Sequence, residues 1–213
     1  VSFNPLKEAG LLNFTHPQNA VDMLLGRSTP ISSHYYQVQI GGDMAAVRAM
    51  AKFLLEKAES DRSVLDHDFL VRHTHGFEEY RRLVAETPWE LLLEQSGLDR
   101  HQIAEAAEVY LGAGSVICCW AMGLTQHRHG VANSQEVVNL LLLRGNIGRP
   151  GAGACPVRGH SNVQGDRTMG ITEEPKEEFL ARLEKEFGFT APRHHGYSTV
   201  HTIKAMADGR VGF

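Results

Sequence analysis

A short segment near the middle of the chain has the residue types of a nucleotide-binding turn. Residues 115–120 form a continuous apolar run, as expected of a strand buried on both faces of a parallel sheet. Gly123 follows this run, and the pattern then predicts a helix over residues 131–144. A strand, a glycine turn and a helix in this order bring free backbone N–H groups and the positive end of a helix together, which favours a pyrophosphate. Many α/β domains share this order without binding a nucleotide, so a solvent-facing turn is the alternative.

Two glycine-rich motifs follow, and with the turn they carry a family resemblance. The turn contributes Met122, Gly123, Thr125 and Gln126; the motifs are residues 145–150 (Gly-Asn-Ile-Gly-Arg-Pro), and 156–159 (Pro-Val-Arg-Gly) with 162–165 (Asn-Val-Gln-Gly). In this order they resemble the molybdopterin oxidoreductase superfamily, in particular the formate dehydrogenase alpha subunits. A weaker match extends upstream through Gly42-Asp43 to Asn4-Pro5. The chain is therefore interpreted as an internal fragment of such an enzyme.

The resemblance implies a cofactor and the residues that bind it. Members of the superfamily hold molybdenum or tungsten through two pyranopterins, each usually extended to a molybdopterin guanine dinucleotide. By the resemblance, a guanosine end lies at Asn4, Gly42 and Asp43, whereas Met122, Gly123 and Gln126 contact phosphate and pterin. The other implied cofactor-binding residues are Arg158, Gly159 and Gln164. The residue that ligates the metal and the cysteines of a 4Fe–4S cluster are expected upstream of this chain.

The chemistry of Asp43 fits a guanine base. A carboxylate can accept two hydrogen bonds, one from N1–H and one from the amino group of guanine, as a charge-assisted pair. The alternative is a plain helix N-cap, because an amphipathic helical pattern begins directly after Asp43. Both roles are compatible, since one carboxylate oxygen can cap while the other contacts the base.

Arg158 and His160 are the catalytic candidates. The resemblance implies that Arg158 stands beside the metal, where a guanidinium can orient formate by binding its carboxylate with two N–H groups. A surface or pterin-bridging arginine is the alternative. His160 occupies a position where a glutamine is common in formate dehydrogenases, so it is either a proton carrier near pH 7 or a neutral hydrogen-bonding substitute. The predicted reaction is the two-electron oxidation of formate to CO2, with the isolated fragment inactive.

Metal binding by this chain itself is not expected. His127 and His129 have no third ligand nearby in the sequence, and neither have the other histidine pairs. The three cysteines, Cys118, Cys119 and Cys155, lack CxxC spacing and are predicted to be buried, reduced side chains.

The alternatives are an NAD-binding module and a scaffold protein that binds no metal. An NAD-type module needs Gly-x-Gly-x-x-Gly directly after its first strand, whereas Gly112-x-Gly114 precedes the strand. A scaffold that binds no metal is disfavoured by the presence of Arg158 and Gln126.

The elements that would position these residues indicate an α/β fold. We expect an incomplete Rossmann-like three-layer αβα domain with a parallel sheet over residues 1–158, and the start of an adjoining α/β domain over 159–213. Asp99 is expected to cap a helix, and residues 145–170 to be an irregular ordered loop. The remaining predicted elements are a strand at 35–40 and helices at 20–25, 66–73, 77–86, 89–95, 175–187 and 199–207.

Composition excludes some partners. A net charge of −4 over 213 residues gives no electrostatic reason to bind nucleic acid or an anionic membrane, and no apolar run reaches the ~20 residues of a membrane span. We expect a cytoplasmic protein whose partners are a formate-like substrate, the rest of the parent polypeptide and an electron-transfer subunit.

Overall fold

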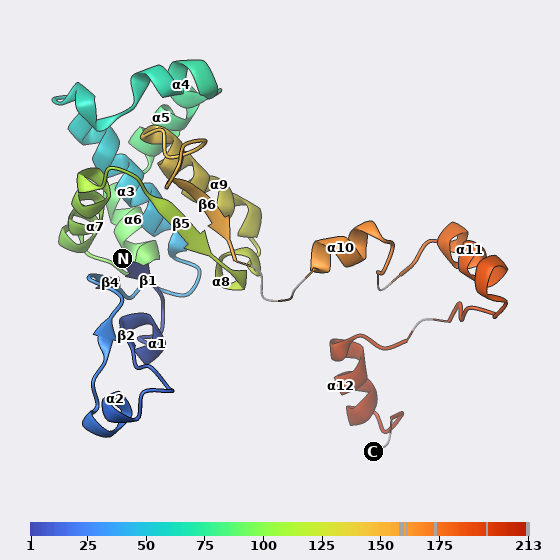
Figure 1. Ribbon diagram of the computed structural model, residues 1–213. Coiled ribbons are helices and arrows are strands. Elements are labelled where there is room, and N and C mark those ends of the chain that lie inside the picture. Colours follow the sequence, from blue (N-terminus) through green and yellow to red (C-terminus); the bar gives the residue numbers. More distant parts are fainter. Residues whose placement is uncertain (158–159, 161, 173, 195, 212–213) are drawn as a thin grey trace. The chain divides into compact units, whose positions relative to one another are not determined.

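The chain folds into two units, which are described separately. The computed structural model describes residues 1–157, 160, 162–172, 174–194 and 196–211. The first unit covers Val1–Gly159 and the second His160–Phe213 (Figure 1). Helices predominate, and two of the three strand pairs are parallel, which confirms the predicted α/β class. Among the described residues, no helix is both long and apolar enough to cross a bilayer.

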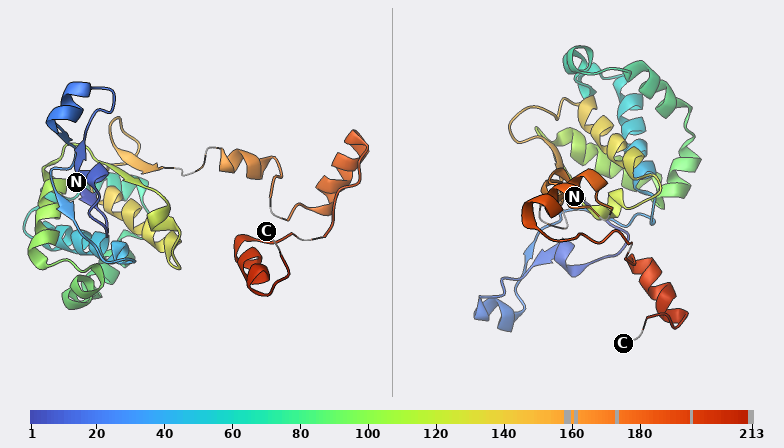
Figure 2. Two further views of the ribbon diagram at one scale, coloured as in Figure 1. Left: turned by 90° about the horizontal axis from the view of Figure 1, so that it is seen from below. Right: turned by 90° about the vertical axis from the view of Figure 1, so that its right-hand side faces the viewer.

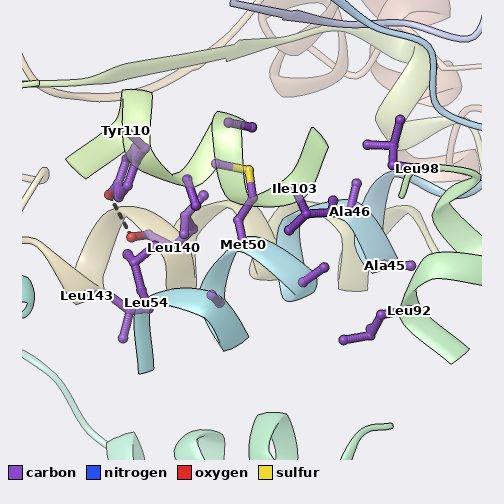
Figure 3. Packing of buried hydrophobic residues seen from close by; sticks show 14 of the residues in the cluster. Ala45, Ala46, Met50, Leu54, Leu92, Leu98, Ile103, Tyr110, Leu140 and Leu143 are labelled. Atoms are coloured by element: carbon purple, nitrogen blue, oxygen red, sulfur yellow. Dashed lines mark hydrogen bonds between the residues drawn. The ribbon is translucent and has the colours of Figure 1, made fainter. Parts of the chain in front are cut away.

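Helix α3 (Asp43–Ala58) is the centre of the first unit. It contacts α5 (Phe77–Glu86), α6 (Trp89–Ser96), α7 (Arg100–Gly112), α9 (Gly130–Leu143) and the 3-10 turn η1 (Arg62–Val64). It is rich in alanine and covered on almost all sides, and Ala49 and Ala51 are completely buried. Met50 and Leu54 fill the space between α3 and its neighbours (Figure 3). This helical layer supports the strands that carry the candidate site.

Side-chain caps fix where several helices begin. Asp99 caps α7: it accepts from the Gln102 backbone N–H at 2.8 Å, while the Gln102 side chain accepts from the Asp99 N–H. Asp66 caps α4 (His67–His73) through the Phe69 N–H. The predicted cap of α7 is therefore confirmed.

Asp43 is not a helix cap, so that prediction was wrong by one position. Gly42 is the N-cap residue of α3, and Asp43 is the first residue of the helix. The chain turns into the helix one residue earlier than predicted, because Gly41 adopts a left-handed conformation with a φ of +82°. Gly42 then packs against α6. A Cβ at Gly42 would lie 2.4 Å from the Gln95 carbonyl oxygen, which only glycine avoids.

A βαβ unit carries the predicted nucleotide-binding turn. Strand β5 (Ile117–Trp120) leads through α8 (Met122–Thr125) into α9, and the chain returns as β6 (Gly153–Pro156), parallel to β5. Two predictions about this region were wrong. Strand β5 is not buried on both faces, because the face that carries Ile117 and Cys119 is open and Ile117 is 54% exposed. Residues 145–170 are not all irregular, because they contain β6 and α10 (Val163–Thr168).

The N-terminal part of the first unit holds two small strand pairs. Strand β1 (Ser2–Phe3) is parallel to β4 (Tyr35–Tyr36), so only the first two residues of the strand predicted over 35–40 form a ladder. Strands β2 (Asn13–Phe14) and β3 (Thr29–Pro30) are antiparallel. Helix α1 (Ala9–Leu12) precedes β2, and α2 (Ala20–Leu25), at the predicted position, connects β2 to β3. Both views of Figure 2 show the α2 segment extending away from the helical layer.

The described residues of the second unit form three helices: α10, α11 (Glu177–Phe187) and α12 (Thr199–Ala207). Both α11 and α12 lie at the predicted positions. Arg193 binds Glu177 and Glu184 of α11, and the Glu184 carboxylate also accepts from the Ala191 N–H at 2.8 Å. These ion pairs hold the segment after α11 against that helix.

Candidate nucleotide-binding site

A cavity of about 1040 Å³ opens in the first unit. It is comparable with the largest of typical ligand pockets, which measure about 300–1,000 Å³. Its walls include the N-terminus to Pro5, the start of α3, and residues 115–121, 123, 124 and 127. Three predicted cofactor-binding residues line it: Asn4, Asp43 and Gly123. They are far apart in the sequence and share one cavity in the fold.

Strand pairing explains how Asn4 and Asp43 come to line the same cavity. Parallel strands end at the same edge of a sheet; Asn4 directly follows β1, and the turn into α3 follows β4. The Asn4 backbone N–H donates to the Tyr36 carbonyl oxygen at 3.1 Å, which fixes Asn4 at that edge. The first turn of α3 also begins there, so free backbone N–H groups and the positive helix end lie at the cavity.

The Asp43 carboxyl group is partly withdrawn from water. Burial raises its pKa, while a hydrogen bond to its own backbone N–H and the charge of His127 act in the opposite direction. A ligand that donated hydrogen bonds to this carboxylate would further favour its ionised form. His127 lines the same cavity. Sequence reasoning considered His127 only as a metal ligand and missed its position near Asp43.

The other residues of the predicted turn divide between cavity and solvent. Around Gly123, no other atom lies within 4 Å of where a Cβ would be, so its backbone borders open space. Met122 and Gln126 are exposed and do not line the cavity; the Gln126 amide nitrogen lies 3.4 Å from the Met122 sulfur. The glycine at position 42 is required by its close packing against α6, and contact of Gly42 with a cofactor stays a prediction. Contact of Met122 and Gln126 with a cofactor stays a prediction.

The described residues of the first unit include neither predicted catalytic residue. Arg158 and Gly159 lie outside the described residues. His160 and Gln164 belong to the second unit, where both are exposed. Convergence of residues 120–165 on one site therefore remains a prediction.

The Gly145–Pro150 motif has a clear structural role. Asn146 is 1% exposed, and its side-chain nitrogen donates to the Tyr110 hydroxyl at 3.0 Å. Its side-chain oxygen accepts from the Val116 N–H at 3.2 Å and from Arg149 at 2.6 Å. The Tyr110 hydroxyl in turn donates to the Leu140 carbonyl oxygen at 2.8 Å, the dashed line in Figure 3. Asn146 thereby joins α7, α9 and the start of β5.

Replacing Asn146 should destabilise the first unit. We expect Asn146→Ala to lower the free energy of unfolding by about 2–3 kcal/mol, because it leaves the part-buried Val116 N–H without its acceptor, removes the buried bond to the Tyr110 hydroxyl and opens space beside Tyr110. Urea unfolding followed by tryptophan fluorescence measures this change, since Trp89 and Trp120 both lie in the first unit. The exposed Asn13 provides the matched control: Asn13→Ala should shift the value by under about 0.5 kcal/mol. Equal effects of the two substitutions would refute the structural role.

The cysteines differ from their predicted state. Cys119 and Cys155 are exposed and Cys118 is half-buried, so the prediction of three buried side chains was wrong. One face of β5, which carries Ile117 and Cys119, is exposed, whereas Cys118 and Trp120 on the other face are half-buried. No group of three or more His, Cys, Asp or Glu in the described part of the chain is arranged to hold a metal ion.

Sequence comparison gives the functional context. No family model matches the chain. Protein YdeP of Escherichia coli K12 is 49% identical over an alignment of 215 positions, which covers 99% of this chain and 28% of that protein. The uncharacterized oxidoreductase Rv2900c of Mycobacterium tuberculosis is 49% identical over 212 residues, covering 99% of the chain and 27% of the relative. The chain is thus related in sequence to oxidoreductases.

A more distant relative points in the same direction. A putative formate dehydrogenase of Staphylococcus aureus, SAR2393, is 31% identical over an alignment of 188 positions, which covers 84% of this chain and 19% of that protein. The relation to oxidoreductases predicted from the motifs is confirmed at this level. The chain spans little more than a quarter of the length of the two relatives that match it at 49% identity.

Proposed function

We propose that the cavity binds the guanosine end of a molybdopterin guanine dinucleotide, within an oxidoreductase that acts on formate or a similar small acid. The observation that carries this proposal is the position of Asp43 in a wall of the cavity, beside Asn4 and the open backbone of Gly123. The oxidoreductase relatives, among them a putative formate dehydrogenase, support the redox class.

The residues present fit a guanosine nucleotide. The partly desolvated Asp43 carboxylate would accept from guanine N1–H and from its amino group, and these donors would offset the cost of burying the charge. The Asn4 side-chain nitrogen already donates to Leu6 O and Glu8, so Asn4 would offer its oxygen to a ligand donor. Gly123 lets phosphate or pterin approach the backbone closely.

The proposed reaction assigns separate tasks to the binding and catalytic residues. The cofactor, when bound, supplies a molybdenum or tungsten centre that accepts two electrons. Oxidation of formate to CO2 releases these two electrons and one proton. Arg158 would hold the formate carboxylate, and His160 would carry the proton. A 4Fe–4S cluster and an electron-transfer subunit would receive the electrons.

Nucleotide titration tests the proposal. With guanosine diphosphate as the probe, calorimetry of the chain should give a dissociation constant at least about tenfold lower than with adenosine diphosphate, because adenine lacks the N1–H and 2-amino donors that Asp43 would accept from. Equal affinities for guanosine diphosphate, adenosine diphosphate and NAD would instead identify a general nucleotide-binding module. Absence of binding to all three would contradict a nucleotide site in this cavity.

A further inference from the structure

Two exposed cysteines lie side by side on neighbouring strands. In the parallel pair β5–β6, Cys119 is directly opposite Cys155. Because side chains alternate along a strand, registered partners share one face, and Cys118 points to the other. Cys119 and Cys155 are both exposed, so reagents in solvent can reach them.

The spacing of the pair suits a covalent bond. Strands in a sheet lie about 4.8 Å apart, whereas disulfides span Cα separations of about 4.4–6.8 Å. The pKa of Cys119 is raised, first by partial burial and second by a side-chain hydrogen bond with Cys155. The two thiols are therefore close enough to interact. The raised pKa of Cys119 disfavours its thiolate.

We propose that Cys119 and Cys155 form a redox-active dithiol site that reacts with small disulfides such as oxidised glutathione. The Cys155 thiolate attacks one sulfur of glutathione disulfide, forming a mixed disulfide and releasing one glutathione thiolate. Cys119 loses its proton to solvent and attacks the Cys155 sulfur of the mixed disulfide, which releases the second glutathione. The protein thiols lose two electrons, and glutathione disulfide gains them as two thiols.

The bond would join the two strands of the βαβ unit covalently. Strand β5 leads within two residues to the turn at Met122 and Gly123, and β6 leads to Val157. Oxidation would therefore fix the separation of the two chain segments that leave this sheet. Cys119 also lines the candidate cavity, but the proposed thiol chemistry depends on strand register and thiol exposure and needs no bound cofactor.

Cys118 supplies the internal control. Burial raises the pKa of its thiol to about 11, so at neutral pH little of it is the reactive thiolate. In a Cys118→Ser variant only Cys119 and Cys155 remain, so any intramolecular disulfide in it must join these two.

Intact-mass analysis after incubation with glutathione disulfide and alkylation tests the site. Wild type and Cys118→Ser should each lose two alkylatable thiols without retaining glutathione, and dithiothreitol should restore both thiols. Cys119→Ser should instead accumulate one stable glutathione adduct, because Cys155 has lost its partner. Glutathione retained on Cys118→Ser at the level of Cys119→Ser, or two free thiols remaining on Cys118→Ser, would overturn the proposal.

Discussion

Asp43→Asn should switch the base preference of the cavity from guanosine to xanthosine nucleotides. A carboxylate accepts from both N1–H and the 2-amino group of guanine, whereas an asparagine presents one acceptor and one donor. Xanthine carries an oxygen in place of the amino group, so it matches asparagine. One such bidentate contact is worth about 1–3 kcal/mol, which corresponds to a change in affinity of roughly 5- to 150-fold. Calorimetric titration with guanosine and xanthosine diphosphates measures both directions of the switch.

Two controls distinguish a loss of base recognition in Asp43→Asn from unfolding of the protein: the stability of this variant and the effect of the same charge change at an exposed position. Burial raises the pKa of Asp43 in the folded state, so its contribution to stability is present at low pH and is lost as pH rises through that pKa. At neutral pH, asparagine removes this cost, and the variant should be at least as stable as the wild type. Asp68→Asn changes the same charge on an exposed helix and should leave both affinities unchanged. A parallel loss of both nucleotides in Asp43→Asn would contradict base recognition by this residue.

Glu136→Leu should cause the largest loss of stability among the changes considered. The Glu136 side chain is 4% exposed on α9 and accepts two hydrogen bonds from Arg48 of α3, at 3.2 and 2.9 Å. It also accepts from the Tyr80 hydroxyl of α5 at 2.8 Å. Removing the carboxylate leaves the mostly buried Arg48 charge and the Tyr80 hydroxyl without this partner. Breaking such a pair typically costs about 3–5 kcal/mol.

A double variant isolates the charge effect. In Arg48→Met/Glu136→Leu neither charge remains, so part of the lost stability should return. Urea unfolding followed by tryptophan fluorescence compares the three proteins. A loss below about 1 kcal/mol in Glu136→Leu, or no recovery in the double variant, would show that the network contributes little.

The helices could be predicted because their signals are local. Asp99 and Gln102 cap α7 through contacts within one turn, and Asn19 caps α2 through the Val21 and Asp22 N–H groups. The strands depend on partners far away in the sequence. Strand β6 forms within a glycine-rich stretch because β5, more than thirty residues earlier, offers hydrogen bonds to it. No local pattern contains that information, and it also determines which faces of β5 are exposed.

The residues of the candidate site could be predicted in part, but their arrangement around one cavity could not. The family resemblance identified Asn4, Asp43 and Gly123, and the structure brings these three around one cavity. Periodicity alone could not have joined them, because their meeting depends on the pairing of β1 with β4 and on the position of β5. The role of His127 near Asp43 was missed for the same reason: the two residues are 84 positions apart and have no shared motif.

The buried alanines of α3 make the first unit unequally tolerant of mutation. Ala45, Ala46, Ala49 and Ala51 have almost no exposed surface, and the neighbouring helices approach the α3 backbone closely. Truncating these side chains removes little volume, so large cavities cannot arise here. Each added methylene, in contrast, would have to displace a neighbouring helix. Substitution of these four alanines by larger residues should therefore be destabilising, whereas Glu56, an exposed position of α3, can vary.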